Sequence, residues 1–158
     1  MIEIERKFLV TSETFKTEAK VNQRIVQGFL NTHPERTVRV RIQGNYGFLT
    51  VKGKSNRTGT TRFEWEKDIP VEEAEMLLEI CEPGIIEKRR YLIEKGKHLF
   101  EVDVFDGVNQ GLTLAEIELQ NENEPFDRPD WLGEEVTGNA KYYNSQLSKH
   151  PFSQWGQR

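Results

Sequence analysis

Hydrophobic and polar residues alternate along many short stretches of this chain. The first stretch, IEIERKF, puts Glu3, Glu5 and Lys7 on one side of an extended backbone and Ile2 and Ile4 on the other. Alternation with a period of two is the pattern of a β-strand, whose successive side chains point to opposite faces. The chain therefore begins with a predicted strand that has one charged face and one mainly apolar face.

The same alternation recurs in runs bounded by turn residues, which is typical of an antiparallel β-protein. Eight strands are predicted, at residues 1–10, 23–32, 36–43, 46–54, 61–69, 85–94, 98–105 and 114–120. Helical spacing and capping residues predict helices over residues 70–80 and 140–149 and a short helix within residues 11–20. The acidic segment 121–131 contains two prolines and is predicted to be a loop.

Seven of these strands have a face that is almost purely ionic. The acids on these faces are Glu3, Glu5, Glu64, Glu66, Glu101, Asp103, Glu116 and Glu118. The bases are Lys7, Arg39, Arg41, Lys52, Lys54, Arg62, Lys88 and Arg90. A plain antiparallel sheet with one solvated face would explain any single strand. It does not explain the set, because neighbouring like charges on one strand face repel each other unless a counter-ion lies among them.

Closing the strands into a barrel accounts for the pattern. Eight strands can curl so that every charged face points inward, with helices covering the apolar outer faces. We therefore predict an α+β fold, an eight-stranded antiparallel β-barrel or tunnel with a charged interior and a few covering helices. Basic side chains bind phosphate oxygens, and carboxylates hold a hard divalent cation such as Mg²⁺ or Mn²⁺. The predicted ligand is a polyphosphate that carries a divalent metal.

Length and composition narrow the possibilities further. The 158 residues are predicted to form a single domain, 1–158, and the net charge of −4 argues against a general nucleic-acid binder. A single cysteine excludes an internal disulfide and a cysteine-rich zinc site. No apolar run approaches the roughly 20 residues of a membrane span, and the first residues do not have the layout of a signal peptide. We expect a cytoplasmic protein that binds no nucleic acid and no membrane.

An ordered set of short motifs resembles one known family. The first is the Glu-x-Glu-x-Lys stretch of residues 3–7, and the others follow along nearly the whole chain. They read QGFL at 27–30, RVR at 39–41, LTVK at 49–52, RFE at 62–64, EKRRY at 87–91, FEVD at 100–103, EIE at 116–118, GEEVT at 133–137 and KY at 141–142. In this order they resemble the CYTH superfamily, the triphosphate tunnel metalloenzymes.

The resemblance implies roles for individual residues inside an eight-stranded tunnel. It implies metal-binding positions at Glu3, Glu5, Asp103, Glu116 and Glu118, with Glu64 beside them. It implies phosphate-binding positions at Lys7, Arg39, Arg41, Lys52, Lys88 and Arg90, with Arg62 beside them and Lys141 reaching in from the C-terminal segment. Phe29 departs from the tyrosine of many short bacterial relatives and removes a hydroxyl group. The roles of Glu66, Glu101 and Lys54 stay open.

The activity that we expect from the resemblance is hydrolysis of inorganic tripolyphosphate to pyrophosphate and phosphate, with Mg²⁺ or Mn²⁺ as cofactor. A second metal, or a carboxylate such as Glu116 or Glu118, would orient and activate water, and Lys7 would stabilise charge on the transferred group. The alternatives are a thiamine or nucleoside triphosphatase, a class IV adenylyl cyclase and a non-catalytic polyphosphate-binding module. The expected partner is a small-molecule triphosphate, and the chain could be a monomer or a homodimer.

Overall fold

A computed structural model describes residues 1–156 of the chain. It contains the eight predicted antiparallel strands, at positions close to those expected from the alternation. Their bounds are β1 Ile2–Val10, β2 Val21–Asn31, β3 Arg36–Gln43, β4 Tyr46–Gly53, β5 Thr61–Ile69, β6 Ile86–Lys95, β7 His98–Phe105 and β8 Thr113–Glu118. The predicted single domain ran to residue 158, so its last two residues lie outside the described part.

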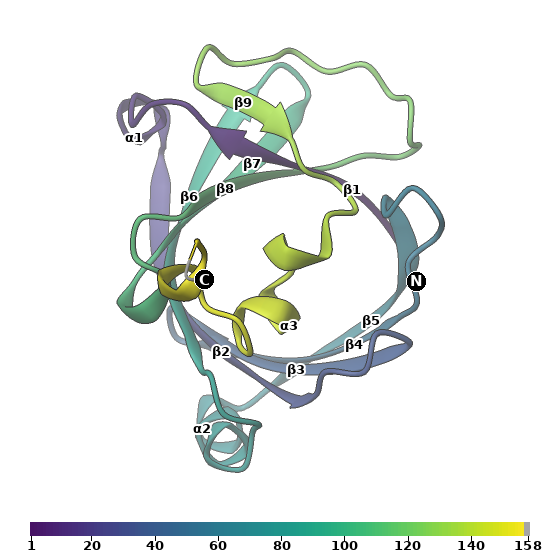
Figure 1. Ribbon diagram of the computed structural model, residues 1–158, viewed down its shortest axis with the longest axis vertical. Helices are drawn as coiled ribbons and strands as arrows, with labels where there is room; N and C mark the ends of the chain where they lie inside the picture. The colour runs from purple at the N-terminus through teal and green to yellow at the C-terminus, as the bar shows by residue number, and fades with distance from the viewer. Residues whose placement is uncertain (157–158) are drawn as a thin grey trace.

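The strands close into a ring, the wall of a barrel (Figure 1). Neighbouring strands follow the order β5-β4-β3-β2-β6-β7-β8-β1, and the pairing of β1 with β5 closes the ring. In the closing pair Glu3 lies opposite Arg62, and Glu5 lies opposite Glu118 on the other edge of β1. The predicted α+β fold, an eight-stranded antiparallel barrel, is confirmed.

A ninth strand was not predicted. The short β9, Leu132–Glu135, pairs with the second half of β1, where Phe8 lies opposite Glu135. It occupies the edge of β1 that β5 uses at residues 2–4, so β1 exchanges one partner for another along its length. Four residues are too few for alternation to show, and the pairing depends on a distant strand. Local sequence therefore carried no signal for it.

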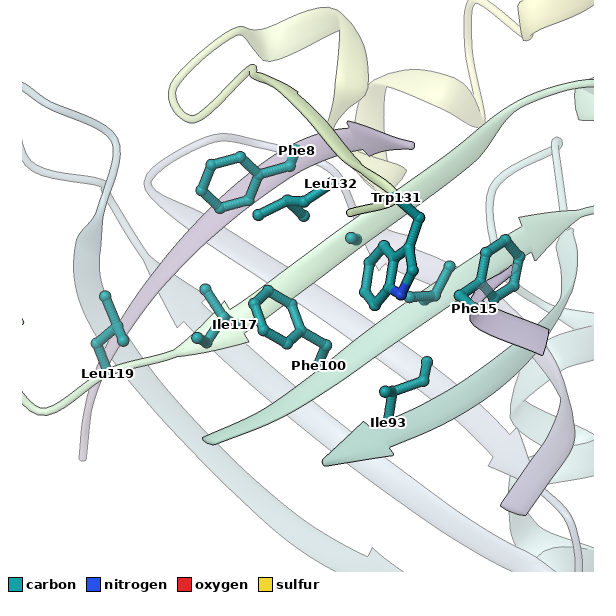
Figure 2. Packing of buried hydrophobic residues seen from close by; sticks show 10 residues of the cluster. Phe8, Phe15, Ile93, Phe100, Ile117, Leu119, Trp131 and Leu132 are labelled. Carbon is teal, nitrogen blue, oxygen red and sulfur yellow. The ribbon is translucent and has the colours of Figure 1, made fainter. Parts of the chain in front are cut away.

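The apolar outer faces of β1, β6, β7 and β8 pack under aromatic side chains (Figure 2). Trp131, at the end of the loop that follows β8, is fully buried and makes edge-to-face contacts with Phe15 and Phe100 at centroid distances of 5.9 and 5.5 Å. Phe15 belongs to the short helix α1, Phe15–Glu18. The helix predicted within residues 11–20 is confirmed, and together with this loop it covers one side of the barrel.

The helix predicted at residues 70–80 is α2, Val71–Glu79, and it packs outside β2, β3 and β4. Ala74 on its inner side is fully buried. It lies against Gly47 of β4, where an added Cβ would come within 3.0 Å of the Ala74 Cβ. The helix therefore approaches the strand closely because neither residue has a large side chain.

The C-terminal segment differs from the prediction in both form and place. Instead of one helix at 140–149 it forms the 3₁₀-turn η2, Ala140–Tyr142, the short helix α3, Asn144–Leu147, and the 3₁₀-turn η3, Phe152–Gln154. Figure 1 shows α3 within the ring of strands, so a role in covering the outer wall is wrong for this segment. Leu147 packs with Tyr142 against inner-wall residues of β6, β7 and β8 and is 1% exposed.

The inner wall is consequently not charged throughout. At the end filled by α3 it carries Ile86, Phe105 and Leu114, which are buried together with Leu112. Two residues further along the same faces stand Lys88, Asp103 and Glu116. The C-terminal segment thus closes one end of the barrel over an apolar patch and leaves the charged part next to it. No helix of residues 1–156 is long and apolar enough to span a membrane.

Candidate active site

A cavity of about 810 Å³, its open mouth included, occupies the charged part of the barrel. Nine of the predicted site residues line it: Glu3, Glu5, Lys7, Arg39, Lys52, Arg62, Lys88, Arg90 and Glu116. The structure brings them together from β1, β3, β4, β5, β6 and β8. Charged faces that are distant in the sequence therefore meet in one place, because barrel closure turns all of them inward.

Asp103 is predicted as a metal ligand, but in the structure its carboxylate is paired with the side chains of Arg90 and Lys88. Arg90 donates two hydrogen bonds to its carboxylate, at 2.8 and 2.9 Å, and Lys88 Nζ lies 2.7 Å from its Oδ2. Burial raises the pKa of Asp103, but attraction to Arg90 and Lys88 outweighs it and brings the pKa to about 2. Asp103 is 2% exposed. It neutralises and orients both cations, and its metal role stays a prediction.

Lys88 has a pKa that moves in the direction opposite to that of an ordinary paired lysine. Complete burial lowers it, the attraction of Asp103 opposes this, and repulsion by Arg90 adds to the lowering, which gives a value of about 8. The two shifts are compatible because Asp103 is flanked by two cations, whereas Lys88 shares its single close anion with Arg90. An additional anion beside Lys88 would favour its charged form, as expected of a phosphate-binding group.

Two pairs of carboxyl groups face each other across neighbouring strands. Glu5 lies within hydrogen-bonding reach of Glu116, and Glu3 lies within reach of Glu64. Burial and the neighbouring charge of Glu116 raise the pKa of Glu5 well above its usual range. Burial likewise raises the pKa of Glu116, but the charges of Lys7 and Arg90 outweigh this and hold the pKa far below its usual range. The pKa values of these two neighbouring carboxyl groups are therefore shifted in opposite directions.

The second pair behaves in the same way with weaker shifts. Burial is the main cause that raises the pKa of Glu3, whereas hydrogen bonding with Glu3 and the charge of Lys52 lower the pKa of Glu64 against the effect of burial. Each pair also has one lysine. Lys52 Nζ lies 3.1 Å from Glu3 and 3.3 Å from Glu64, and Lys7 Nζ lies 3.5 Å from Glu116.

The donor chemistry of these pairs fits a divalent cation. Two close carboxyl groups repel each other when both are charged, and a cation between them would relieve this repulsion. Oxygen donors alone are the ligands that Mg²⁺ and Mn²⁺ prefer. Within residues 1–156, no three carboxylate, imidazole or thiolate groups converge on one point. The pairs formed by Glu5 with Glu116 and by Glu3 with Glu64 are therefore the parts of the chain that would hold a metal.

Arg39 and Arg41 form the basic wall of β3. Glu66 accepts hydrogen bonds from Arg39 at 3.5 Å, from Arg41 at 3.3 Å and from Thr50 at 2.7 Å. Burial, and then repulsion by Arg39 and by Arg90, lowers the pKa of Arg41 to about 9. The buried Nε atoms of Arg39 and Arg41 have no hydrogen-bond partner within residues 1–156. One glutamate thus serves two arginines, and the wall keeps donors for an anion.

Some predicted residues do not line the cavity. Glu118 is exposed and, with Glu101, lines a second, more open hollow at the other end of β7 and β8. Arg41 and Glu64 are not among the lining residues, and Lys54 is exposed. Lys141 is also exposed, with Nζ 4.6 Å from the centre of the Trp155 ring. The structure does not bring Lys141 to the site.

Residues next to Lys141 reach the site instead. Lys7 Nζ donates to the carbonyl oxygen of Tyr142 at 3.2 Å, and Lys88 Nζ donates to Asn144 Oδ1 at 3.0 Å. Gln27 donates to the same Asn144 oxygen at 3.1 Å. Sequence reasoning missed these contacts because Asn144 is uncharged and its segment shows no strand alternation. The remaining uncharged lining residues include Phe29, Thr37, Thr50, Ser55, Gly59, Thr60, Thr137, Gly138, Tyr143 and Ser145.

The fold and the cavity define a class of protein: a closed antiparallel β-tunnel whose interior combines clustered cations with paired carboxyl groups. The family model described as "CYTH domain" matches residues 1–151, and this chain belongs to the CYTH family. The resemblance found in the sequence is thereby confirmed. Membership of this family implies a divalent metal cofactor in general.

Relatives named inorganic triphosphatase are similar to this chain over almost their whole length. The chain is 48% identical over 152 residues to the inorganic triphosphatase of Acetivibrio thermocellus, and the match covers 95% of both chains. It is 39% identical over 155 residues to the inorganic triphosphatase of Nitrosomonas europaea, covering 94% of this chain and 97% of that one. The crystal structure of the inorganic triphosphatase NE1496 matches with a TM-score of 0.64 at 37% identity, covering 92% of this chain and 97% of the other.

Proposed function

We propose that this chain is a metal-dependent hydrolase that converts inorganic tripolyphosphate to pyrophosphate and phosphate. The observation that carries the proposal is one cavity in which six basic side chains, those of Lys7, Arg39, Lys52, Arg62, Lys88 and Arg90, lie with three glutamates. Basic residues alone would suffice to bind a polyphosphate, so the glutamates indicate use of a metal. The two similar proteins named inorganic triphosphatase support the same activity.

The basic side chains bind and orient the substrate. Arg90 is fixed by its two hydrogen bonds to Asp103, and Lys88 is fixed by Asp103 and Asn144. Side chains that are already held in place lose little conformational freedom when a phosphate binds, so they can stabilise charge that develops in the transition state. Lys7, next to Glu116, is positioned to stabilise charge on the transferred phosphoryl group.

The glutamate pairs would hold the cofactor, for which we propose Mg²⁺ or Mn²⁺. When bound, such an ion neutralises phosphate oxygens and polarises the phosphoryl group toward attack. Of the two predicted catalytic carboxylates, Glu116 lines the cavity and Glu118 does not. Glu116 is ionised, so it accepts a hydrogen bond from water and orients its oxygen toward the terminal phosphorus. A new P–O bond forms there while the bond to the pyrophosphate oxygen breaks, and one proton of the water passes to the departing pyrophosphate.

The test is release of phosphate from tripolyphosphate, ATP and thiamine triphosphate, each measured with Mg²⁺, with Mn²⁺ and with EDTA. We expect rapid release from tripolyphosphate that EDTA abolishes. Preference for ATP or thiamine triphosphate would show that the proposed substrate is wrong, whereas the proposed reaction, hydrolysis of a triphosphate, would still hold. Tight metal-dependent binding without phosphate release would contradict hydrolysis and leave the cyclase or the binding module.

Other expectations stay predictions. They are the extent of the domain over 1–158, the cytoplasmic location, the lack of nucleic-acid binding, and the metal roles of Asp103 and Glu118. The contribution of Lys141 to substrate binding and the choice between monomer and homodimer also stay open. The phosphate-release assay, repeated with conservative variants of these residues, would test each individual role.

A further inference from the structure

Residues 54–60, between β4 and β5, form a loop across the side of the cavity, here called the strap. Ser55, Gly59 and Thr60 of the strap line the cavity, as does Gly138 of the C-terminal segment. The two backbones touch, because an added Cβ at Gly59 would lie 2.4 Å from the Gly138 Cα. Both glycines have positive φ, 79° and 80°. The cavity is therefore closed on this side by a backbone contact between Gly59 and Gly138. Any residue with a Cβ atom would prevent this contact.

One carboxylate outside the barrel fixes the strap. Glu122, in the loop after β8, accepts hydrogen bonds from Asn56 Nδ2 at 2.6 Å, from Thr58 Oγ1 at 2.9 Å and from the hydroxyl of Thr60. Thr61 Oγ1 lies 3.4 Å from the same oxygen. Glu122 itself does not line the cavity. It contacts the outer side of the strap while Gly138 contacts the inner side.

Backbone hydrogen bonds hold the two ends of the strap, from the Glu5 amide to Thr60 O at 2.9 Å and from the Asn56 amide to Thr61 O at 2.8 Å, so side-chain contacts matter most for its middle. Asn56 Oδ1 accepts from the backbone amides of Thr60 at 3.0 Å and Thr61 at 3.1 Å, which shapes the end of the loop. Its residues 56–58 are exposed. A short polar loop without a buried apolar anchor is held mainly by such hydrogen bonds. Removal of the Glu122 carboxylate would free the outer side of the strap.

We propose that Glu122 is a positioning residue that holds the strap closed and thereby makes the cavity select triphosphates without an organic group. The inference rests on the proposed function and concerns its substrate class. The strands fill their side of the cavity with charged groups suited to phosphate. A nucleoside or similar substituent needs room where such groups are lacking, and the strap and the segment around Gly138 occupy that room.

The first test compares Glu122→Ala with the wild type on tripolyphosphate and on ATP. We expect the ratio of kcat/KM for ATP to kcat/KM for tripolyphosphate to rise about tenfold, a size typical of steric discrimination in a pocket. Glu122→Gln keeps an acceptor oxygen and should retain most of the wild-type ratio. Asp130→Ala, which removes an exposed carboxylate from the same loop, is the matched control and should leave the ratio unchanged. Equal loss on both substrates would overturn the proposal, because a general structural defect has that effect.

Asn56→Ala releases the strap from the opposite side of the same contact. It removes one of the hydrogen bonds that Glu122 accepts and leaves those from Thr58 and Thr60, so it should raise the ratio less than Glu122→Ala does. The double variant should show less than the sum of the two shifts, because the two residues contact each other. If the shifts in the ratio caused by Glu122→Ala and Asn56→Ala simply added, the two residues would not act through their shared contact. If the wild type releases phosphate from no triphosphate, the proposed function fails. In that case the role of Glu122 is tested by calorimetry, which measures the affinities for tripolyphosphate and for ATP. Glu122→Ala should then raise the affinity for ATP relative to that for tripolyphosphate.

Discussion

The inner wall of the barrel has two regions that lie side by side on the same strands. On β6, β7 and β8 the apolar residues Ile86, Phe105 and Leu114 pack against the C-terminal segment. Two positions along each strand, the inward residue becomes Lys88, Asp103 or Glu116, and the cavity begins. One region therefore buries hydrocarbon and the other buries charge, although the backbone geometry continues unchanged from one to the other.

The difference separates what stabilises the fold from what performs the chemistry. Burial of apolar side chains contributes directly to stability. Burial of ion pairs contributes little, because desolvation of the charges offsets their mutual attraction. The apolar region therefore holds the segment that closes the barrel, whereas the charged region is retained for the substrate. Variants in the charged region, in the apolar region and outside both regions test this division.

The largest effect is expected from Glu5→Gln, which alters the charged region alone. The amide can still bond to Glu116, so the fold should persist, but one carboxylate of a cation-binding pair is lost. We expect kcat/KM for tripolyphosphate to fall on the order of a thousandfold. Phosphate release and circular dichroism measure the two properties, with the exposed Glu134→Gln of β9 as control. If Glu5→Gln kept the full wild-type activity, Glu5 would not be a metal ligand.

The next effect concerns stability in the charged region. Asp103→Ala leaves Arg90 and Lys88 buried without their shared anion, which should cost about 3–5 kcal/mol of unfolding free energy. Urea denaturation measures it. A triple variant with apolar residues at all three positions should regain most of the stability while remaining inactive. A small cost for the single variant would show that the cations find other partners, and the comparison between the regions would then be wrong.

Leu147→Ala tests the apolar region. Leu147 is almost fully buried, so the lost contacts and the resulting cavity should cost about 2–4 kcal/mol. Because Asn144 lies on the same short helix, its contact with Lys88 should also loosen, and KM for tripolyphosphate should rise. Urea denaturation and steady-state kinetics separate the two effects. Unchanged stability would mean that the C-terminal segment is not anchored by this region.

The smallest effect belongs to an ion pair outside both regions. Arg6 donates to both carboxylate oxygens of Glu135, at 2.9 and 2.6 Å, and joins β1 to β9. Hydrogen bonding with Arg6 lowers the pKa of Glu135 below its ordinary value of 4.5, although burial opposes this. Its stabilising effect is therefore complete above pH 4.5 and is lost as the pH falls through the lowered pKa.

The measurement is the difference in unfolding free energy between the wild type and Glu135→Gln as a function of pH. We expect about 1 kcal/mol or less at neutral pH, because the pair is partly exposed. The difference should vanish under acid conditions. A difference that persists well below pH 4 would assign the effect to the packing of β9 rather than to the charge of Glu135.

The barrel could be predicted from the sequence because its two faces differ so strongly. A charged position and an apolar position alternate on strand after strand, and only closure places all the charges together. Strand β9 and the inward position of α3 could not be predicted in this way. Both are fixed by contacts with strands far away in the chain, such as Glu135 with Phe8 and Leu147 with β6–β8, and local spacing carries no information about these.

The site could be predicted to the extent that it is charged. Nine of the expected residues meet in the cavity, whereas Lys141, the charged residue predicted from the C-terminal segment, points elsewhere. Uncharged partners such as Asn144, Gly59 of the strap and Gly138 were not identified from the sequence. A neutral side chain becomes important only through its neighbours in space. The division between Glu116, inside the cavity, and Glu118, outside it, likewise required the register of β1 and β8.

The partners of β1 have a consequence for how the protein is made. This first strand pairs with β5, β8 and β9, all of which are synthesised much later. While the chain emerges from the ribosome, Glu3 can meet Arg62 once β5 is made. Glu5 and Lys7 wait for β8, which carries their neighbours Glu118 and Glu116, and pairing over such distances is slow. Hydrogen exchange during refolding should show the amides of β1 protected among the last. The activity should appear only at the end of folding, when the two ends of the chain meet.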